Sequence, residues 1–163
     1  MSKLADYGTV IMTAMAREPQ RIQSAADVAL RTGVAPPTVS KILKRLAREG
    51  LIVSVRGAKG GYVLPRSPAQ ISVAEIILAM EGSLGMTECS SIPGLCARES
   101  SCTVRGNWQR INQIVLHVLR EMTLDQMTRP VPQTVNISAI KSGRYPGAGV
   151  NANAVATNRR SLR

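Results

Sequence analysis

Apolar residues recur with helical spacing in three segments near the start of the chain. The first runs over 4–16, the second over 24–33, and the third over 36–50. Ser24 followed by Asp27 matches a capping box, and Gly33 suits the position just beyond a helix end. The third segment carries its apolar residues at i, i+3, i+4 and i+7: Val39, Ile42, Leu43 and Leu46. The pattern therefore predicts three short helices.

The pattern changes after Gly50. A β-branched run over 51–55 and a second run over 62–64 flank a glycine-rich turn, which predicts a two-stranded hairpin. Another capping box, Ser72 with Glu75, precedes an apolar helix that ends at Gly82. From 104 to 122 the apolar residues alternate in steps of four and three, as in helices that pack against another helix. This stripe fits a dimer interface or the chain's own core, and we expect the dimer interface.

These elements predict a mainly α fold with a small β-hairpin wing, that is, a winged helix-turn-helix plus a long C-terminal dimerisation helix. We divide the chain into a DNA-binding domain (1–82), a cysteine cluster loop (83–103), the dimerisation helix and end of the fold (104–130), and a basic tail without acids that we expect to be disordered (131–163). No apolar run approaches the roughly 18 residues of a membrane span. We expect a cytoplasmic protein without a membrane partner.

Basic residues concentrate over the third predicted helix and the hairpin. The net charge is +11, and the stretch 31–66 holds eight basic residues against one acid, Glu49. Such a stripe matches a polyanion such as DNA, whose neutralised phosphates release counterions. A solvated surface that keeps a protein soluble carries similar charge. Charge alone leaves both readings open.

The order of the elements favours DNA. In a winged helix-turn-helix the second helix of the motif enters the major groove, and a glycine-rich wing can approach the backbone or minor groove closely. An ordinary turn with solvated basic residues is the alternative for the wing, and the basic helix before it favours contact with double-stranded DNA. We predict base contacts from Thr38, Ser40 and Lys41 and backbone contacts from Lys44 and Arg45. The wing contributes Arg56, Lys59, Gly60, Gly61 and Tyr62.

The three cysteines, Cys89, Cys96 and Cys102, lie in one short segment. Their spacing lacks the paired cysteines of common zinc sites. Thiolate-rich sites select iron–sulfur clusters, which need about four protein ligands, so one ligand is missing. The sole histidine, His117, falls off the apolar stripe and is expected at the surface. A thiol redox role explains the spacing equally well. No cysteine–histidine or Ser–His–Asp arrangement supports an enzyme.

Taken together, the motif 38–43, the wing 56–62, the helix 71–82 and the three cysteines resemble the IscR/NsrR family of bacterial winged-helix regulators, over about residues 1–130. The resemblance implies a homodimer and cluster-dependent operator binding. It also implies a cluster, of 2Fe–2S or 4Fe–4S type, near the dimer interface, with the three cysteines as ligands.

The fourth ligand sets this chain apart within the resemblance. The iron–sulfur-assembly members carry a histidine three residues after the last cysteine, where this chain has Arg105, although Trp108 matches them. The opening 4–8 is similar to the nitric-oxide-sensing members, whose aspartate ligates the partner's cluster. Asp6 is thus implied as a possible fourth ligand from the partner subunit, or it caps the first helix. The opening and the wing also resemble regulators of the SUF cluster-assembly operon, which implies a repressor of those genes. A nitric-oxide- or thiol-redox-sensing repressor with another regulon is the alternative.

Overall fold

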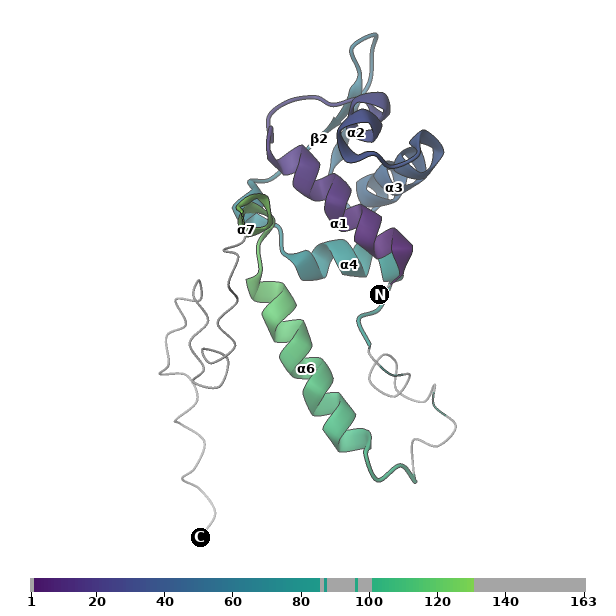
Figure 1. The fold of residues 1–163 in the computed structure, drawn as a ribbon, viewed down its shortest axis with the longest axis vertical. Helices are drawn as coiled ribbons and strands as arrows, with labels where there is room; N and C mark the ends of the chain where they lie inside the picture. Colours follow the sequence, from purple (N-terminus) through teal and green to yellow (C-terminus); the bar gives the residue numbers. More distant parts are fainter. Residues whose placement is uncertain (1, 86, 88–95, 97–100, 131–163) are drawn as a thin grey trace. The chain divides into compact units, whose positions relative to one another are not determined.

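The computed structural model describes residues 2–85, 87, 96 and 101–130, and Figure 1 shows their elements in chain order. The elements are α1 (Lys3–Ala16), α2 (Ala25–Thr32), α3 (Pro36–Arg48), β1 (Val53–Val55), β2 (Gly61–Val63), a 3-10 turn η1 (Pro68–Gln70), α4 (Val73–Glu81), α6 (Arg105–Glu121) and α7 (Leu124–Thr128).

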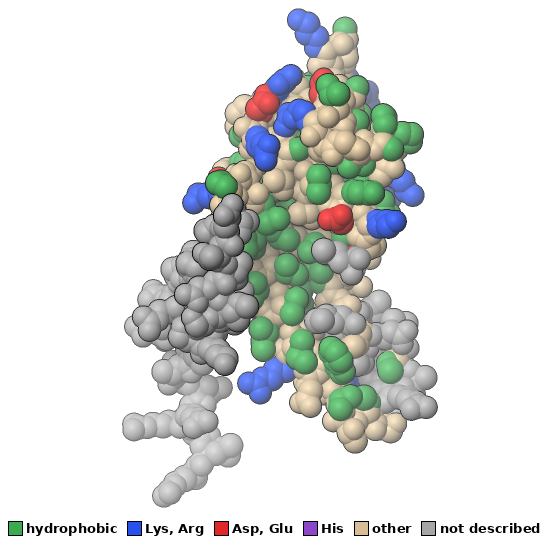
Figure 2. Space-filling view, in the orientation of Figure 1, with side chains coloured by type: hydrophobic (Ala, Val, Ile, Leu, Met, Phe, Trp, Pro, Cys, Tyr) green, Lys and Arg blue, Asp and Glu red, His purple; other side chains and the backbone are tan. Residues whose placement is uncertain are grey.

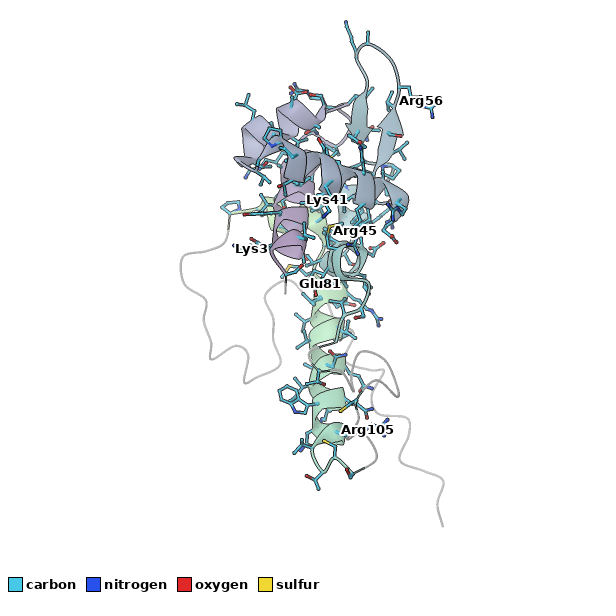
Figure 3. All side chains as sticks on the ribbon, turned by 90° about the vertical axis from the view of Figure 1, so that its right-hand side faces the viewer. Lys3, Lys41, Arg45, Arg56, Glu81 and Arg105 are labelled. Carbon is cyan, nitrogen blue, oxygen red and sulfur yellow. The ribbon has the colours of Figure 1, made fainter. Side chains whose placement is uncertain are left out.

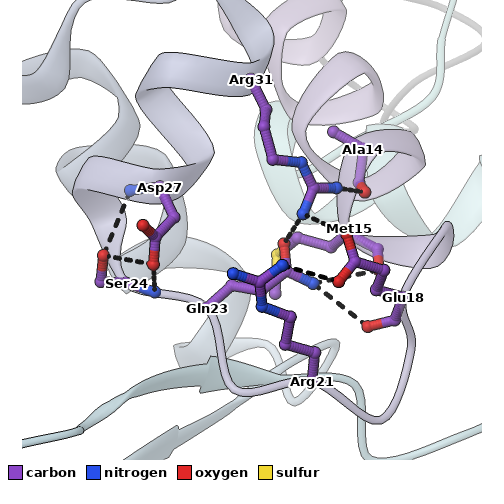
Figure 4. Close-up of polar contacts among 8 residues, drawn as sticks. All are labelled: Ala14, Met15, Glu18, Arg21, Gln23, Ser24, Asp27 and Arg31. Carbon is purple, nitrogen blue, oxygen red and sulfur yellow. Dashed lines mark hydrogen bonds and ion pairs between the residues drawn. The ribbon is translucent and has the colours of Figure 1, made fainter.

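Local signals in the sequence define the helix-turn-helix. The hydroxyl of Ser24 accepts from the backbone N–H of Asp27, whose carboxylate accepts in return from the backbone of Ser24, so the predicted capping box is confirmed (Figure 4). Gly33 ends α2 with a φ of 69°, a conformation that a residue without a Cβ adopts readily. Helix α3 then starts at Pro36, where a missing N–H costs nothing. These three signals set the turn between α2 and α3.

The wing is a two-stranded antiparallel hairpin. Val53 pairs with Val63 and Val55 with Gly61. The first strand begins two residues later than its β-branched run suggests, because Leu51 and Ile52 are buried in the core beneath the helices.

Helices α1, α3 and α4 build the core that carries the helix-turn-helix and the wing. Its fully buried side chains come from these three helices, the segments between them and the start of α7, and they include Ile11, Met12, Met15, Val39, Ile42, Leu43, Leu46, Ile52, Ile71, Ile76 and Leu124. All four residues of the predicted apolar stripe of α3 belong to this core. The predicted fold class, mainly helical with a small β-hairpin wing, is confirmed.

Helix α6 extends away from this core, and one end is tied back to it. Ser72 and Thr123 form an isolated antiparallel bridge beside the start of α4, and Leu119 and Met122 pack against the core. Toward the N-terminal end of α6 the apolar stripe is open to solvent, as the green side chains over α6 show in Figure 2. Its exposed members are Val104, Trp108, Ile111, Val115 and Val118. This part of the stripe is therefore not core of the single chain. None of the described helices is long and apolar enough to cross a membrane.

Candidate nucleic-acid interface and cysteine segment

A row of exposed basic side chains lies on α3 and continues onto the wing. Lys41, Lys44 and Arg48 share the face of α3 opposite its buried stripe, and Arg56 and Lys59 extend from the hairpin. Figure 3 shows Lys41 on α3 and Arg56 standing out from the wing. None of these five side chains forms an ion pair within the described part of the chain. Their charge is therefore available to a polyanion.

The remaining basic residues of the stretch 31–66 are already occupied. Arg31 lies 3.4 Å from the carboxylate of Glu18, and Arg66 lies 2.9 Å from that of Glu75. Burial raises the pKa of Glu75, but hydrogen bonds from Ser72 and Arg66 outweigh it and hold that pKa below its ordinary value. Fewer basic residues of this stretch are thus available to a polyanion than the sequence alone indicates.

Arg45 faces the protein interior. Its Nε donates to the carbonyl oxygen of Ala79 at 2.7 Å, so the guanidinium joins α3 to the last turn of α4. The sequence predicted a DNA-backbone contact for this residue, and that contact stays a prediction. The hydrogen bond gives it a role in positioning α3, which sequence reasoning missed.

The other predicted DNA contacts lie at accessible but less exposed positions. Thr38 and Ser40 are half-buried on the first two turns of α3. Tyr62 is half-buried and packs against the core from β2. Their contacts with bases or phosphates stay predictions.

Two glycines of the wing are required by close backbone contacts within the protein. A Cβ on Gly60 would lie 2.5 Å from the carbonyl oxygen of Val55, and one on Gly61 would lie 2.5 Å from that of Gln23. Both distances are too short for a real side chain. The close approach of backbone to backbone explains these glycines without DNA, and their contact with DNA stays a prediction.

The cysteine segment is described only in part. Cys96 and Cys102 are half-buried free thiols, whereas Cys89 lies outside the described residues. The carbonyl oxygen of Cys102 accepts from the backbone N–H of Arg105 at 3.4 Å, which links this cysteine to the start of α6. The described residues hold no group of three or more side chains able to bind a metal ion. Since the described residues include only two of the three cysteines, the predicted three-cysteine ligand set stays a prediction.

Asp6 is exposed in the first turn of α1. The helix is capped by Ser2, whose hydroxyl accepts from the backbone N–H of Ala5 at 3.3 Å. Ser2, and not Asp6, therefore caps this helix, and the Asp6 carboxylate forms no hydrogen bond or ion pair with the described residues. His117 is exposed on α6, as expected.

Comparisons with known proteins agree with this geometry. Residues 1–130 match the family model Rrf2, described as an iron-dependent transcriptional regulator. The chain is 30% identical over 129 residues to the HTH-type transcriptional regulator IscR of Cronobacter sakazakii, covering 77% of this chain and 79% of that protein. It is 31% identical over 104 residues to IscR of Xenorhabdus nematophila, covering 64% of this chain but only 63% of that relative.

A solved structure, that of CymR, the global cysteine regulator of B. subtilis, is similar with a TM-score of 0.66 and 28% identity. The similarity covers 78% of this chain and 95% of CymR.

Proposed function

Because the chain belongs to the Rrf2 family of transcriptional regulators, we propose that it is an iron–sulfur-cluster-dependent DNA-binding repressor, acting as a homodimer, of SUF-type cluster-assembly genes. The observation that carries the DNA-binding part is the row of exposed basic residues on α3 and the wing that have no ion pair within the described chain. Five such charges neutralise phosphates on both sides of a groove that α3 enters.

The donor chemistry fits an iron–sulfur cluster. Cys96 and Cys102 are unpaired thiols, and thiolates are the ligands that such clusters take. Cys89 and the partner subunit's Asp6 would complete four ligands. When bound, the cluster would supply sensitivity to iron supply, oxidation and nitric oxide, and an oxygen ligand from the partner subunit's Asp6 would hold its iron less tightly than a thiolate.

A chain of contacts joins the cysteine segment to the DNA-reading helix. The backbone of Cys102 is hydrogen-bonded to the start of α6, and the segment after α6 pairs with the N-cap of α4 through the bridge of Thr123 and Ser72. The last turn of α4 in turn accepts the hydrogen bond from Arg45 on α3. Ligation of the thiolates would restrain the start of α6. We propose that this restraint changes the spacing of the two recognition helices of the dimer, which read half-sites about one helical turn apart.

The cofactor is tested with protein purified without oxygen. We expect visible absorbance with matching iron and acid-labile sulfide, and we expect Cys96→Ala to abolish all three. Ser101→Ala, a polar neighbour at an exposed position, is the matched control and should keep them. Unchanged absorbance in the Cys96 variant would remove this residue from the site. A mobility shift on the DNA upstream of the chain's own gene, with and without iron, tests cluster-dependent binding.

A thiol-redox repressor with another regulon is the second candidate. The similarity to CymR, named as a global cysteine regulator, favours it, as do the two free thiols. It requires protein without iron or sulfide whose DNA affinity changes on oxidation and recovers with a reductant. Iron and sulfide in the anaerobic protein would exclude this candidate. A response to nitric oxide alone would instead indicate the nitric-oxide-sensing alternative.

A further inference from the structure

Gln23 lies where the wing joins the helices, and it is only 1% exposed. Its backbone N–H donates to the carbonyl oxygen of Tyr62 at 2.9 Å, and its carbonyl oxygen accepts from the N–H of Tyr62 at 2.8 Å. Gln23 thus acts as a one-residue third strand beside β2. This bridge therefore joins β2 to the segment directly before α2.

The side chain of Gln23 holds that backbone in place. Its Nε2 donates to the carbonyl oxygens of Met15 at 3.3 Å and Glu18 at 3.2 Å. Its Oε1 accepts from Nη1 of Arg31 at 2.8 Å, and Arg31 also contacts Glu18 and the carbonyl of Ala14 (Figure 4). The amide uses both of its hydrogens and its oxygen. No apolar side chain and no carboxylate makes the same three bonds.

Gly61 adapts the wing to this support. A Cβ at Gly61 would lie 2.5 Å from the carbonyl oxygen and 2.7 Å from the carbonyl carbon of Gln23. Backbone atoms cannot move aside as the end of a flexible side chain can. The strand therefore approaches Gln23 this closely only because residue 61 is glycine.

We propose that Gln23 is a positioning residue that sets the placement of the wing relative to α3, so that Arg56 and Lys59 meet the phosphates beside the groove that α3 occupies. The side chain joins the end of α1 to α2, and its backbone passes that constraint to β2. This inference rests on the proposed function, since it assumes that the wing contacts DNA. The support of β2 by Gln23 can be measured without DNA.

The DNA test is a double-mutant cycle between Gln23 and Lys59, read by fluorescence anisotropy of a labelled duplex from upstream of the chain's own gene across a salt series. Removing one phosphate contact with Lys59→Ala should lower the salt slope by about one. We expect Gln23→Ala to lose more of the salt slope in the wild-type background, where both wing contacts are present, than in the Lys59→Ala background, where only that of Arg56 remains. Gln20→Ala, at an exposed position of the same loop, is the control and should leave the slope unchanged. Equal losses from Gln23→Ala in both backgrounds would overturn the proposal.

The test without DNA is amide hydrogen exchange. Gln23→Ala should speed exchange at Tyr62, whose N–H is bonded to Gln23, while the amide of Ile42 within α3 keeps its protection. Faster exchange at both sites to the same degree, or at neither, would refute a positioning role. Faster exchange at Tyr62 with no effect of Lys59→Ala on binding would leave the positioning intact and refute the wing contact with DNA. Should Gln23→Ala fail to fold, Gly61→Ala displaces β2 from the other side and gives the same two readouts.

Discussion

Replacing Arg45 by alanine separates the two roles that a basic residue on a recognition helix can have. The Nε of Arg45 donates to the carbonyl oxygen of Ala79 at 2.7 Å, in a half-buried position between α3 and α4. A hydrogen bond from a charged group contributes about 1.5–3 kcal/mol, and partial exposure places this one near the lower end. A loss of about 1.5 kcal/mol lowers the Tm of a domain of this size by about 5 °C.

The assay is thermal and urea denaturation of Arg45→Ala beside Lys41→Ala. Lys41 lies one turn earlier on α3, is exposed and forms no ion pair among the described residues. We expect Lys41→Ala to keep the Tm and to weaken DNA binding with a smaller salt slope. We expect Arg45→Ala, in contrast, to lower the Tm by about 5 °C. A variant of Arg45 with an unchanged Tm and a loss of affinity like that of Lys41→Ala would refute the structural role and support the predicted DNA contact.

Three further predictions follow from burial and charge. Val118→Glu on the exposed stripe of α6 should reduce the mass of the particle measured by light scattering, whereas Gln113→Glu, on a polar position of α6, should not; an unchanged mass for Val118→Glu would contradict dimerisation through α6. The lowered pKa of Glu75 means that its carboxylate stabilises the fold above its ordinary pKa and that this stability is lost as the pH falls through the lowered value. Glu75→Gln should therefore flatten the acid side of a plot of urea midpoint against pH, and a wild-type acid side would argue against the effect. Leu46→Ala removes a fully buried side chain of α3 and should cost about 2–5 kcal/mol in urea denaturation; a loss under about 1 kcal/mol would show that the core closes around the cavity.

Elements defined by neighbouring residues were predictable from the sequence. Both capping boxes, Ser24 with Asp27 and Ser72 with Glu75, form as predicted because each joins residues three apart. The apolar stripe of α3 was also predicted, since helical periodicity alone decides which side chains it buries.

Contacts between distant parts of the chain were not predictable in this way. The bond from Arg45 to Ala79 joins residues 34 apart, and only the packing of α3 on α4 creates it. Gln23 looks like one more polar residue in a loop until the fold buries it. Gly61 was assigned to DNA because glycine permits close approach, and the structure shows that the backbone of Gln23 is what approaches. The position of Gln23 directly before the capping Ser24 is a local signal, but it does not reveal the burial.

The bridge between Ser72 and Thr123 also governs the segment that carries the cysteines. The N–H of Val73 donates to the carbonyl of Met122 at 2.9 Å, and the N–H of Leu124 donates to that of Ile71 at 2.8 Å. The chain that leaves α4 and returns through α6 is therefore a closed loop, and its closure entropy is lost when the helices pack. Since each doubling of such a loop adds only about 0.6 kcal/mol, residues inserted between the thiols should barely change the stability of the fold. The number of residues between the cysteines can therefore vary at little cost to the stability of the fold.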